Sequence, residues 1–357
     1  MHARAASSAA AAGGGGGSSE GPSICVVGAG VIGMTSALRI KQALPAASVT
    51  VVAEQLEDTT SHCAGGLWKP YTLGDTPPEL VNRWGRDTLQ HYLGLYQSPE
   101  APAAGAVLTS AYQLFRQPVP NPEWAQVVPH FRQMSEAERR VLDPEGSHSH
   151  GWFYTTVITE GRLYMGWLAQ QLAAAGGQRL ARRVAAVEEL AGHDVVVNCT
   201  GLGAKALFGD DSCYPVRGHV LRVRAPWVRH YTNSENGPGE ESTYIIPNSE
   251  TVVLGGTLGP GDWDTTPREA DRRRIFERAC AVLPSLRSAE LVAEWVGLRP
   301  GRPSVRLELE EVQLKGGSSK PSLPVVHNYG HGGAGLTLAW GCAGDAAQLV
   351  QQALARR

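Results

Sequence analysis

Two short β-branched runs with a helix-length stretch between them stand near the start of the chain. Residues 24–27 are apolar throughout, residues 31 to about 43 have helical length, and residues 49–52 are again β-branched. Continuous apolar runs of this length are typical of strands buried in a parallel sheet. The pattern predicts a βαβ unit.

The rest of the chain alternates between helical and strand-like patterns. Helices are predicted over 79–97, from 135, over 161 to about 175, over about 267–283, and from the glycine turn at 330–335 to 354. Strands are predicted over 107–115, 153–159, about 182–187, 194–199, 216–223, 242–246, 251–256, within 289–307 and from 325. The close spacing of the strands from 216 to 256 indicates an antiparallel sheet. The polar, glycine-rich segment 233–241 is a candidate mobile lid.

Three glycines follow the first predicted strand in the G-x-G-x-x-G spacing. Gly28 permits a tight turn, Gly30 has no Cβ to hold a pyrophosphate away from the backbone, and Gly33 lets helix and strand pack closely. Glu54 stands about 20 residues further on, where a carboxylate accepts from ribose hydroxyls. The alternative is a glycine-rich turn that binds nothing. The strand, the helix and the acid together favour an adenine dinucleotide site.

Composition excludes other classes of partner. The 357 residues carry a formal net charge of −2 at pH 7, which provides no electrostatic footprint for nucleic acid or an anionic membrane. No apolar run approaches the roughly 20 residues that span a bilayer. The six cysteines are scattered without a C-x-x-C pair, which predicts reduced thiols and no metal site. Residues 1–22 are rich in Ala, Gly and Ser, and we expect a disordered extension there.

A series of motifs resembles the D-amino-acid oxidase / D-aspartate oxidase family of flavoproteins, in that family's order. They are VVGAGVIG (26–33), AGGLWKPY (64–71), GWFYT (151–155), DVVVNCTG (194–201), PVRGHVL (215–221), APWVRH (225–230), YIIP (244–247), VVLGGT (252–257), GLRPGRPSVRL (297–307) and HNYGHGGAGLT (327–337). The resemblance covers about 24–354 and implies an α/β fold with two interleaved domains. A Rossmann-type FAD-binding domain (23–70, 155–214 and 297–354) would alternate with an α+β substrate domain (71–154 and 215–296) that contains an antiparallel sheet.

The resemblance implies that FAD lies extended across this fold. Its pyrophosphate would lie at the first glycine turn, its ribose on Glu54, its isoalloxazine against 66–68, and its pyrimidine end at the turn 332–337. The implied cofactor-binding residues are Gly28, Ala29, Gly30, Val31, Ile32, Gly33, Glu54, Thr59, Thr60, Ser61, Gly65, Gly66, Leu67, Trp68, Val184, Thr200, Gly201, Arg299, Gly330, Gly332, Gly333, Ala334, Gly335, Leu336 and Thr337.

The resemblance also assigns the substrate contacts. Arg299 would bind the substrate carboxylate through two parallel N–H donors, and Tyr244 would donate to the same carboxylate. Tyr71 would line the side-chain pocket, and the Gly333 carbonyl would accept from the substrate amine. No side-chain base is expected, and we interpret His331 as structural. The implied reaction is FAD-dependent oxidation of a D-amino acid by O2 to a 2-oxo acid, ammonia and hydrogen peroxide.

The choice between neutral and acidic substrates stays open at this point. Leu258 stands where D-aspartate oxidases have an arginine, and Glu240 and Glu241 in the candidate lid would repel an acidic side chain. Both features favour neutral D-amino acids. Arg217, Arg222 and Arg224 lie on nearby predicted strands and are the alternative source of a cation. His62 stands where the family has an aspartate-like residue, and Ala334 replaces a larger one.

Other functions, the location and the assembly are also left open. A protein that holds a dinucleotide without turnover and an NAD-dependent dehydrogenase share the glycine motif. The family tends to be peroxisomal, but the chain ends in ALARR rather than a targeting tripeptide, so a cytoplasmic location is the other expectation. The resemblance allows a homodimer. It implies no partner beyond the D-amino acid, O2 and FAD.

Overall fold

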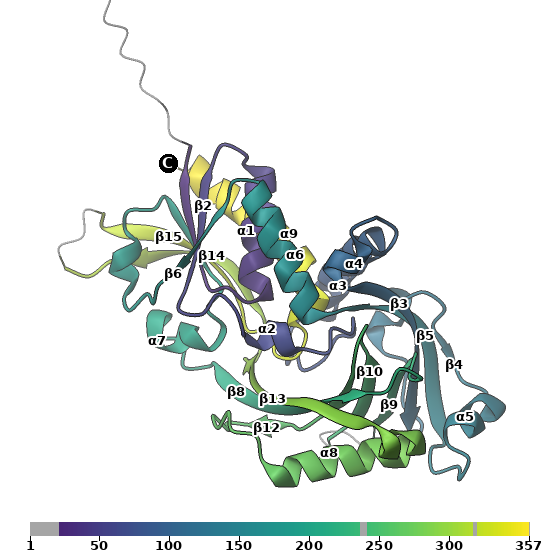
Figure 1. Ribbon diagram of the computed structural model, residues 1–357. Helices are drawn as coiled ribbons and strands as arrows, with labels where there is room; N and C mark the ends of the chain where they lie inside the picture. The colour runs from purple at the N-terminus through teal and green to yellow at the C-terminus, as the bar shows by residue number, and fades with distance from the viewer. Residues whose placement is uncertain (1–20, 236–240, 317–319, 357) are drawn as a thin grey trace, which may run out of the picture.

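The protein is built on two β-sheets that meet along one side (Figure 1). The structure, a computed structural model, describes residues 21–235, 241–316 and 320–356. One sheet has six strands and the other has nine, and both are assembled from segments far apart in the sequence. This confirms the predicted α/β fold with an antiparallel second sheet.

The six-stranded sheet contains the predicted βαβ unit. Its order is β14-β15-β7-β1-β2-β6, and all neighbouring pairs are parallel except β14 with β15. The strands are β1 (Ser23–Val27), β2 (Ser48–Ala53), β6 (Gln178–Ala181), β7 (Val195–Asn198), β14 (Arg306–Gln313) and β15 (Ser322–Tyr329).

The continuous apolar runs of this sheet arise because both faces are covered. In β1, Ile24 and Val26 belong to the main core, whereas Cys25 and Val27 pack on the opposite face. Helices α1 (Val31–Ala43), α6 (Gly161–Ala174), α9 (Gly335–Ala355) and α3 (Pro78–Tyr96) gather on the main-core side (Figure 1). The other face is covered by the short 3-10 helix η2 (Val187–Leu190) and by side chains of α7 (Ala204–Phe208).

The nine-stranded sheet has the order β12-β8-β11-β10-β9-β3-β5-β4, with β13 also paired to β8. Neighbours are antiparallel except β3 with β9. The strands are β3 (Ala106–Phe115), β4 (Arg132–Gln133), β5 (His150–Thr159), β8 (Tyr214–Arg224), β9 (Tyr231–Glu235), β10 (Thr243–Pro247), β11 (Val252–Gly255), β12 (Gly259–Pro260) and β13 (Glu290–Gly301). Helix α8 (Glu269–Val282) packs on one face and buries Ile275 and Ala279 against β8, β10 and β11.

Short helices complete the chain. They are α2 (Thr60–Cys63), α4 (Ala101–Ala104), α5 (Glu136–Leu142), and the 3-10 helices η1 (Glu123–Gln126), η3 (Gly201–Gly203) and η4 (Pro284–Ser288). Throughout the described part of the chain, no helix combines the length and the apolar character that crossing a bilayer requires.

Two sequence-based element predictions were wrong. The strand expected at about 182–187 lies at Gln178–Ala181, and most of the predicted segment is irregular. The segment 289–307, expected to hold a single strand, contains all of β13 and the first two residues of β14, and these two strands belong to different sheets.

Other predictions meet the structure only in part. Residues 233–235 of the candidate lid are the end of β9, and 236–240 lie outside the described residues, as do residues 1–20 of the predicted extension. The domain boundaries stay a prediction. Three of them, at 154/155, 214/215 and 296/297, fall inside β5, β8 and β13.

Candidate active site

A cavity of about 970 Å³ lies where the two sheets meet. Its wall includes the β1–α1 turn, the end of β2, the segment around α2, the β7–α7 connection, and the turn before α9. Strands β8, β9, β10 and β13 of the other sheet supply the remaining side. The cavity therefore joins the predicted dinucleotide site to the predicted substrate residues.

The first glycine turn has the backbone form that the motif predicts. Gly28 has φ of +112°, and a Cβ there would overlap the carbonyl group of Cys199. A Cβ on Gly33 would overlap the carbonyl of Gly28, so this glycine serves close packing. A Cβ on Gly30 would meet only the Ser61 Oγ, at 3.5 Å, and would otherwise project into the cavity. The glycines thus leave a backbone surface that a ligand can approach.

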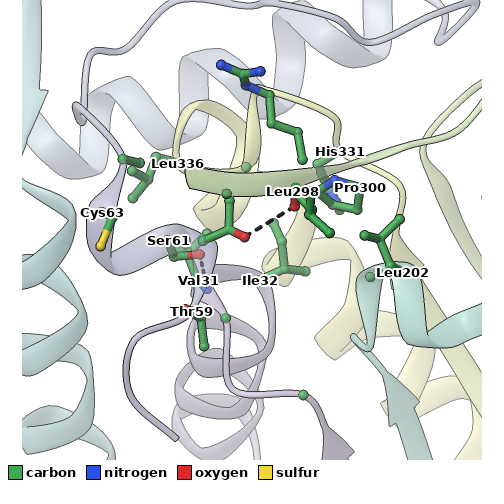
Figure 2. Close-up of a pocket in the computed structure, with 18 of the residues that line it drawn as sticks. Val31, Ile32, Thr59, Ser61, Cys63, Leu202, Leu298, Pro300, His331 and Leu336 are labelled. Atoms are coloured by element: carbon green, nitrogen blue, oxygen red, sulfur yellow. Dashed lines mark hydrogen bonds between the residues drawn. The ribbon is translucent and has the colours of Figure 1, made fainter. Parts of the chain in front are cut away.

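The segment around α2 is tied to both sides of the cavity (Figure 2). The Val31 N–H, in the first turn of α1, donates to Ser61 Oγ at 2.9 Å. Thr60 Oγ1 donates to the Leu298 carbonyl of β13 at 3.2 Å. His62 is buried and contacts Thr59 and Glu57, and it does not line the cavity. His62, which stands where the family has an aspartate-like residue, therefore contacts this loop and not the cavity.

The second glycine turn places the N-terminus of a long helix at the cavity. Gly330 and Gly332 have φ of +87° and +52°, and the Gly333 N–H donates to Thr72 Oγ1 at 2.7 Å. Helix α9 begins at Gly335 and runs for 21 residues. Its first N–H groups and its dipole favour negative charge on a ligand at this end of the cavity.

Several buried polar atoms of the lining have no hydrogen-bond partner among the described residues. They are the Asn233 Oδ1, the Asn328 Oδ1 and the His331 Nε2. Burial lowers the pKa of His331 to about 3, so this ring is neutral at physiological pH. Unpaired buried polar atoms are costly, and a bound ligand relieves that cost. With two helix N-termini and the bare Gly30, the lining fits an extended, anionic dinucleotide such as FAD.

Most of the predicted cofactor residues line this one cavity, but three do not. Gly33, Trp68 and Ala334 are the exceptions. Trp68 is buried in the main core and its indole N–H donates to the Gly85 carbonyl at 3.0 Å. Ala334 is fully buried in a small cluster beside α9. These two contribute packing behind the wall.

Arg299 and Tyr244 face the same cavity from different strands. Arg299 Nη1 donates to the carbonyls of Thr257, at 3.2 Å, and Arg217, at 3.4 Å. Within the described residues Arg299 makes no ion pair and its other N–H groups have no hydrogen-bond partner. The Tyr244 ring lies against Gly255 and Gly256, where any Cβ would overlap it. A positioned guanidinium without a carboxylate partner is what an anionic ligand needs.

Tyr71 and Gly333 lie together at the cavity edge. A Cβ on Gly333 would stand 2.6 Å from the Tyr71 ring, so the close approach depends on glycine. Burial raises the pKa of Tyr71, and Arg299 acts in the opposite direction. The charges of Glu235 and Glu241 also raise this pKa. Tyr71 therefore keeps its proton and is close to all of these groups.

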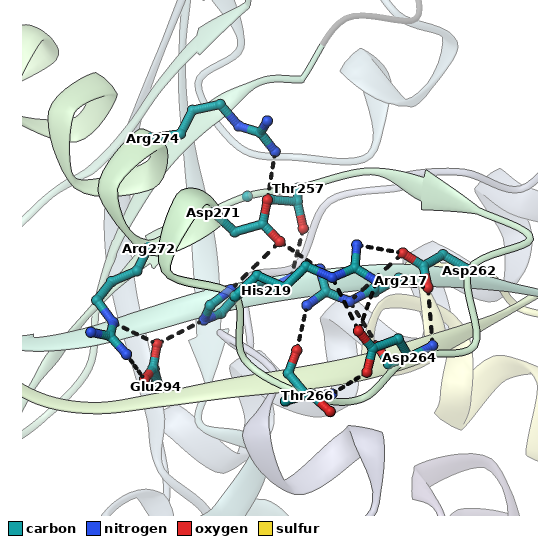
Figure 3. A network of polar contacts seen from close by, with 12 residues as sticks. Arg217, His219, Thr257, Asp262, Asp264, Thr266, Asp271, Arg272, Arg274 and Glu294 are labelled. Atoms are coloured by element: carbon teal, nitrogen blue, oxygen red, sulfur yellow. Dashed lines mark hydrogen bonds and ion pairs between the residues drawn. The ribbon is translucent and has the colours of Figure 1, made fainter.

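The alternative arginines are engaged elsewhere. Arg217 is almost fully buried and contacts Asp271, at 2.7 Å, and two backbone carbonyls (Figure 3). Arg222 donates to Asn248 and Thr251, and Arg224 pairs with Glu290 at the surface. None of the three arginines lines the cavity.

Glu241, expected to repel acidic substrates, is itself neutralised. It pairs with Arg278 at 2.9 Å and with Arg274 at 3.2 Å, both on α8. It also accepts from the Leu258 N–H. Its negative charge is therefore a weaker obstacle to an acidic ligand than the sequence suggested.

Three further polar residues of this region were not predicted. Lys69 and Asn233 line the cavity, and Glu235 pairs with Lys69 at 3.0 Å. The alternation along β9 could have indicated them, because Asn233 and Glu235 are two residues apart on the strand next to Tyr244. The segment was instead assigned to a lid.

Comparison with known proteins agrees with this geometry. A model of the family described as FAD dependent oxidoreductase matches residues 23–349. Human D-aspartate oxidase is 42% identical over 334 residues, which cover 92% of this chain and 94% of that protein. A D-amino-acid oxidase from Rubrobacter xylanophilus is 41% identical over 332 residues, covering 92% and 96%.

Solved structures show the same fold at lower sequence identity. The glycine oxidase from Geobacillus kaustophilus superposes with a TM-score of 0.71 at 20% identity, covering 94% of each chain. The fold and the cavity are those of a flavin-type dinucleotide-binding oxidoreductase. The chain belongs to the FAD-dependent oxidoreductase family, within the group formed by the D-amino-acid and D-aspartate oxidases.

Proposed function

We propose that this enzyme oxidises D-amino acids that have uncharged side chains. The D-amino acid, O2 and water would give a 2-oxo acid, ammonia and hydrogen peroxide. The observation that carries the proposal is the guanidinium of Arg299, which has no carboxylate partner among the described residues and shares a cavity with Tyr244 and the dinucleotide-type turns. The relatives named D-amino-acid oxidase and D-aspartate oxidase support the oxidation of D-amino acids, and the choice of uncharged side chains rests on the charges described below.

The chain's own groups bind and orient the substrate. Arg299 would bind the α-carboxylate with the N–H groups that point away from the Thr257 and Arg217 carbonyls. Tyr244 would donate to the same carboxylate, and the Gly333 carbonyl would accept from the amine. These contacts would fix two substituents of the α-carbon, so a D and an L substrate would differ in the directions in which the α-hydrogen and the side chain must point. The pKa of His331 is too low for it to serve as a base at neutral pH, consistent with a reaction governed by alignment.

FAD, when bound, supplies the two-electron acceptor for the substrate and passes the electrons to O2. The backbone at Gly28, Gly30 and Val31 would hold its pyrophosphate, and Glu54 would accept from the ribose. Glu54 is largely exposed and lies 4.0 Å from Arg183, so it is available to a ligand. The lining residues of the segment 59–67, Val184, Thr200, Gly201 and the turn 330–337 would complete the site.

The preference for uncharged side chains rests on the charges near the cavity. Leu258 supplies no cation, Arg217 is held by Asp271, and Arg222 and Arg224 lie outside the lining. A second substrate carboxylate removed from water needs a cation or several donors. Lys69 is the described lysine of the lining, and Glu235 balances its charge.

The test is substrate oxidation by the FAD-loaded enzyme. We expect peroxide release with D-alanine and D-methionine, none with their L forms, and a higher kcat/KM for these two than for D-aspartate at pH 7. A protein that cannot be loaded with FAD, or that is loaded and releases no peroxide with any D-amino acid, would contradict the proposal. In the second case, flavin absorbance that persists under anaerobic D-amino acid would indicate a dinucleotide-binding protein without turnover.

D-aspartate oxidation is the second candidate, because a D-aspartate oxidase is 42% identical over most of the chain. If D-aspartate has the highest kcat/KM, this candidate replaces the first. We expect Leu258→Arg to increase D-aspartate activity, since it adds a cation next to Thr257, whose carbonyl accepts from Arg299. A homodimer and a peroxisomal location remain predictions from the family.

A further inference from the structure

A connected set of polar side chains lies at the Tyr71 side of the cavity. Lys69 Nζ is 3.0 Å from Glu235 Oε1, and Gln113 Nε2 donates to the same oxygen at 2.6 Å. Tyr154 donates to Gln113 Oε1 at 3.4 Å. The Lys69 and Glu235 side chains are 14% and 31% exposed, so their charges are only partly shielded by water.

Asn233 extends this set into the cavity. In the sheet it stands opposite Tyr244 of β10 and opposite Gln113 of β3, so the three side chains share one face. Asn233 is 1% exposed and lines the cavity. Its Oδ1 has no hydrogen-bond partner among the residues that the structure describes.

This polar set is close to the proposed carboxylate site. Asn233 pairs in the sheet with Tyr244, and both line the cavity together with Arg299. Lys69 and Tyr71 are two residues apart on one segment, and both line the cavity. A substrate held by Arg299 therefore has Tyr71 beside it and the polar set within reach of its side chain.

We propose that Lys69, Glu235 and Asn233 recognise the substrate's side chain and select an uncharged one that carries a hydrogen-bond donor. The carboxamides D-asparagine and D-glutamine are the substrates that fit this description. The inference rests on the proposed function, because it takes the α-carboxylate to lie on Arg299.

The chemistry of a carboxamide matches the three residues. Its oxygen accepts a hydrogen bond from the Lys69 ammonium, which has three N–H groups and shares one with Glu235. Its NH2 group donates to the Asn233 Oδ1. An apolar side chain of similar length leaves that oxygen unpaired. A charged side chain meets one partner of its own sign, and neither Lys69 nor Glu235 is free to neutralise it.

The first experiment compares substrates on the FAD-loaded wild-type enzyme. D-glutamine is compared with D-methionine, which has similar length without the amide, and D-asparagine with D-aspartate. We expect kcat/KM to be about tenfold or more higher for each carboxamide. A kcat/KM for D-methionine equal to or above that for D-glutamine would overturn the inference.

The second experiment changes the charge of the pair. Glu235→Gln leaves the Lys69 charge uncompensated, so D-glutamate should gain about tenfold relative to D-glutamine. Lys69→Met leaves Glu235 uncompensated, so D-lysine should gain by a similar factor. The controls are Glu290→Gln and Lys205→Met, which break surface ion pairs away from the polar set. Unchanged charge preferences in both Glu235→Gln and Lys69→Met would overturn the inference.

The third experiment removes the unpaired oxygen. Asn233→Leu should abolish the preference for D-glutamine over D-methionine while D-methionine oxidation persists. A retained preference for D-glutamine would overturn the inference. Flavin absorbance and melting temperature identify folded variants. If Lys69→Met does not fold, Lys69→Gln and Glu235→Gln decide the question.

The outcomes separate this inference from the proposed function. If the FAD-loaded wild type oxidises no D-amino acid, the proposed function fails and the inference fails with it. If the wild type oxidises D-alanine but the variants leave the side-chain preferences unchanged, the inference alone fails.

Discussion

At the residue scale, Arg299 is held from behind so that its charge faces the cavity. Its guanidinium lies on the backbone of Gly218, and Nη1 donates to the carbonyls of Thr257 and Arg217. A flexible arginine normally loses side-chain entropy on binding an anion, and these contacts reduce that loss before the ligand arrives. These backbone contacts therefore preorganise Arg299 to bind an anion.

Replacing Arg299 tests the proposed carboxylate contact. Arg299→Leu should raise KM and also lower kcat, because the substrate loses both binding energy and orientation. Charge-assisted hydrogen bonds contribute about 1.5–3 kcal/mol, so kcat/KM should fall at least about 10- to 100-fold. Arg299→Lys should recover part of the binding but less of the turnover, since it lacks the two-pronged geometry. Wild-type kinetics in Arg299→Leu would show that the carboxylate lies elsewhere.

Gly218 offers a test that leaves Arg299 in the chain. A Cβ at this position would overlap the Arg299 guanidinium, which would have to move. Gly218→Ala should therefore reduce kcat/KM by a factor of ten or more, with flavin binding retained. Gly192→Ala is the matched control, because a Cβ there meets no atom within 4 Å. Equal activity of both variants would mean that the position of Arg299 is not important.

At the scale of elements, the crossing of α3 and α9 positions the second glycine turn. Helix α9 begins at the cavity, and further along it Gly341 packs directly on the backbone of Trp84 in α3. Arg83 and Trp84 both donate to Asp345 of α9, at 2.7–2.8 Å. The end of α9 that faces the ligand is therefore held by contacts more than one turn away.

Glycine-to-alanine substitutions in α9, α3 and α6 should change the free energy of unfolding in opposite directions, depending on the space around each glycine. Gly341→Ala places a Cβ against the Trp84 backbone and should reduce the free energy of unfolding by about 1–3 kcal/mol. Gly94→Ala in α3 and Gly166→Ala in α6 place a Cβ in open space and should each raise it by up to about 1 kcal/mol. Denaturant unfolding of the FAD-loaded proteins measures all three. A neutral Gly341→Ala would contradict the tight crossing.

The elements that the sequence predicted well were those with a strong local pattern. The βαβ unit, α3, α6, α8, α9 and the strands around β8, β10 and β11 follow from apolar periodicity and turn residues. Strand β6 is exposed along its length, so it has no apolar pattern and was placed too late in the chain. Strand β14 alternates charged and apolar residues and pairs with the next strand along the chain, β15, so a local pattern was present there and was missed.

The site was predicted by motif more than by physics. The first glycine turn follows from the G-x-G-x-x-G spacing, whereas Arg299 and Tyr244 were assigned from the resemblance to the family, and their roles stay predictions. Lys69 and Glu235 were missed because each is an ordinary charged residue in sequence, and only the fold brings them to 3.0 Å. The contribution of Arg217 was left open for the same reason, since its partner Asp271 lies on a helix 54 residues away.

At the scale of the whole molecule, acid stability depends on histidines that are buried, or partly buried as His91 is, in the neutral form. Burial lowers the pKa of His91 to about 3, of His331 to about 3 and of His327 to about 4. Arg39 adds to the effect at His91 and Arg306 at His327. In the unfolded chain these rings titrate near 6.5, so only the unfolded state takes up their protons between about pH 6.5 and 4.

The sign of the pH effect follows from this difference. Because the unfolded state binds more protons, the free energy of unfolding rises with pH in that window and levels off above it. The stability is therefore lost as the pH falls below 6.5, by up to about 1.4 kcal/mol per pH unit for each histidine. Carboxylates affect the free energy of unfolding at lower pH. For example, burial raises the pKa of Asp143, but hydrogen bonds from His148 and Ser147 hold it at about 2, so its contribution is lost only as the pH falls below its usual value of 3.8.

We therefore expect the FAD-loaded enzyme to lose stability steadily from pH 6.5 to 4.5, above the range where its paired carboxylates titrate. His91→Phe should make this slope shallower by the contribution of nearly one proton, because phenylalanine cannot be protonated in either state. Phenylalanine also keeps the stack on Trp340, whose ring centroid lies 3.5 Å from that of His91. The variant will also lose the hydrogen bond between His91 and Tyr164, so its stability should be lower at pH 7.5. The informative quantity is the slope of the free energy of unfolding against pH, measured by denaturant titration at each pH. Curves for wild type and His91→Phe that run parallel from pH 6.5 to 4.5 would show that His91 takes up its proton in the folded state, and that burial does not hold it neutral.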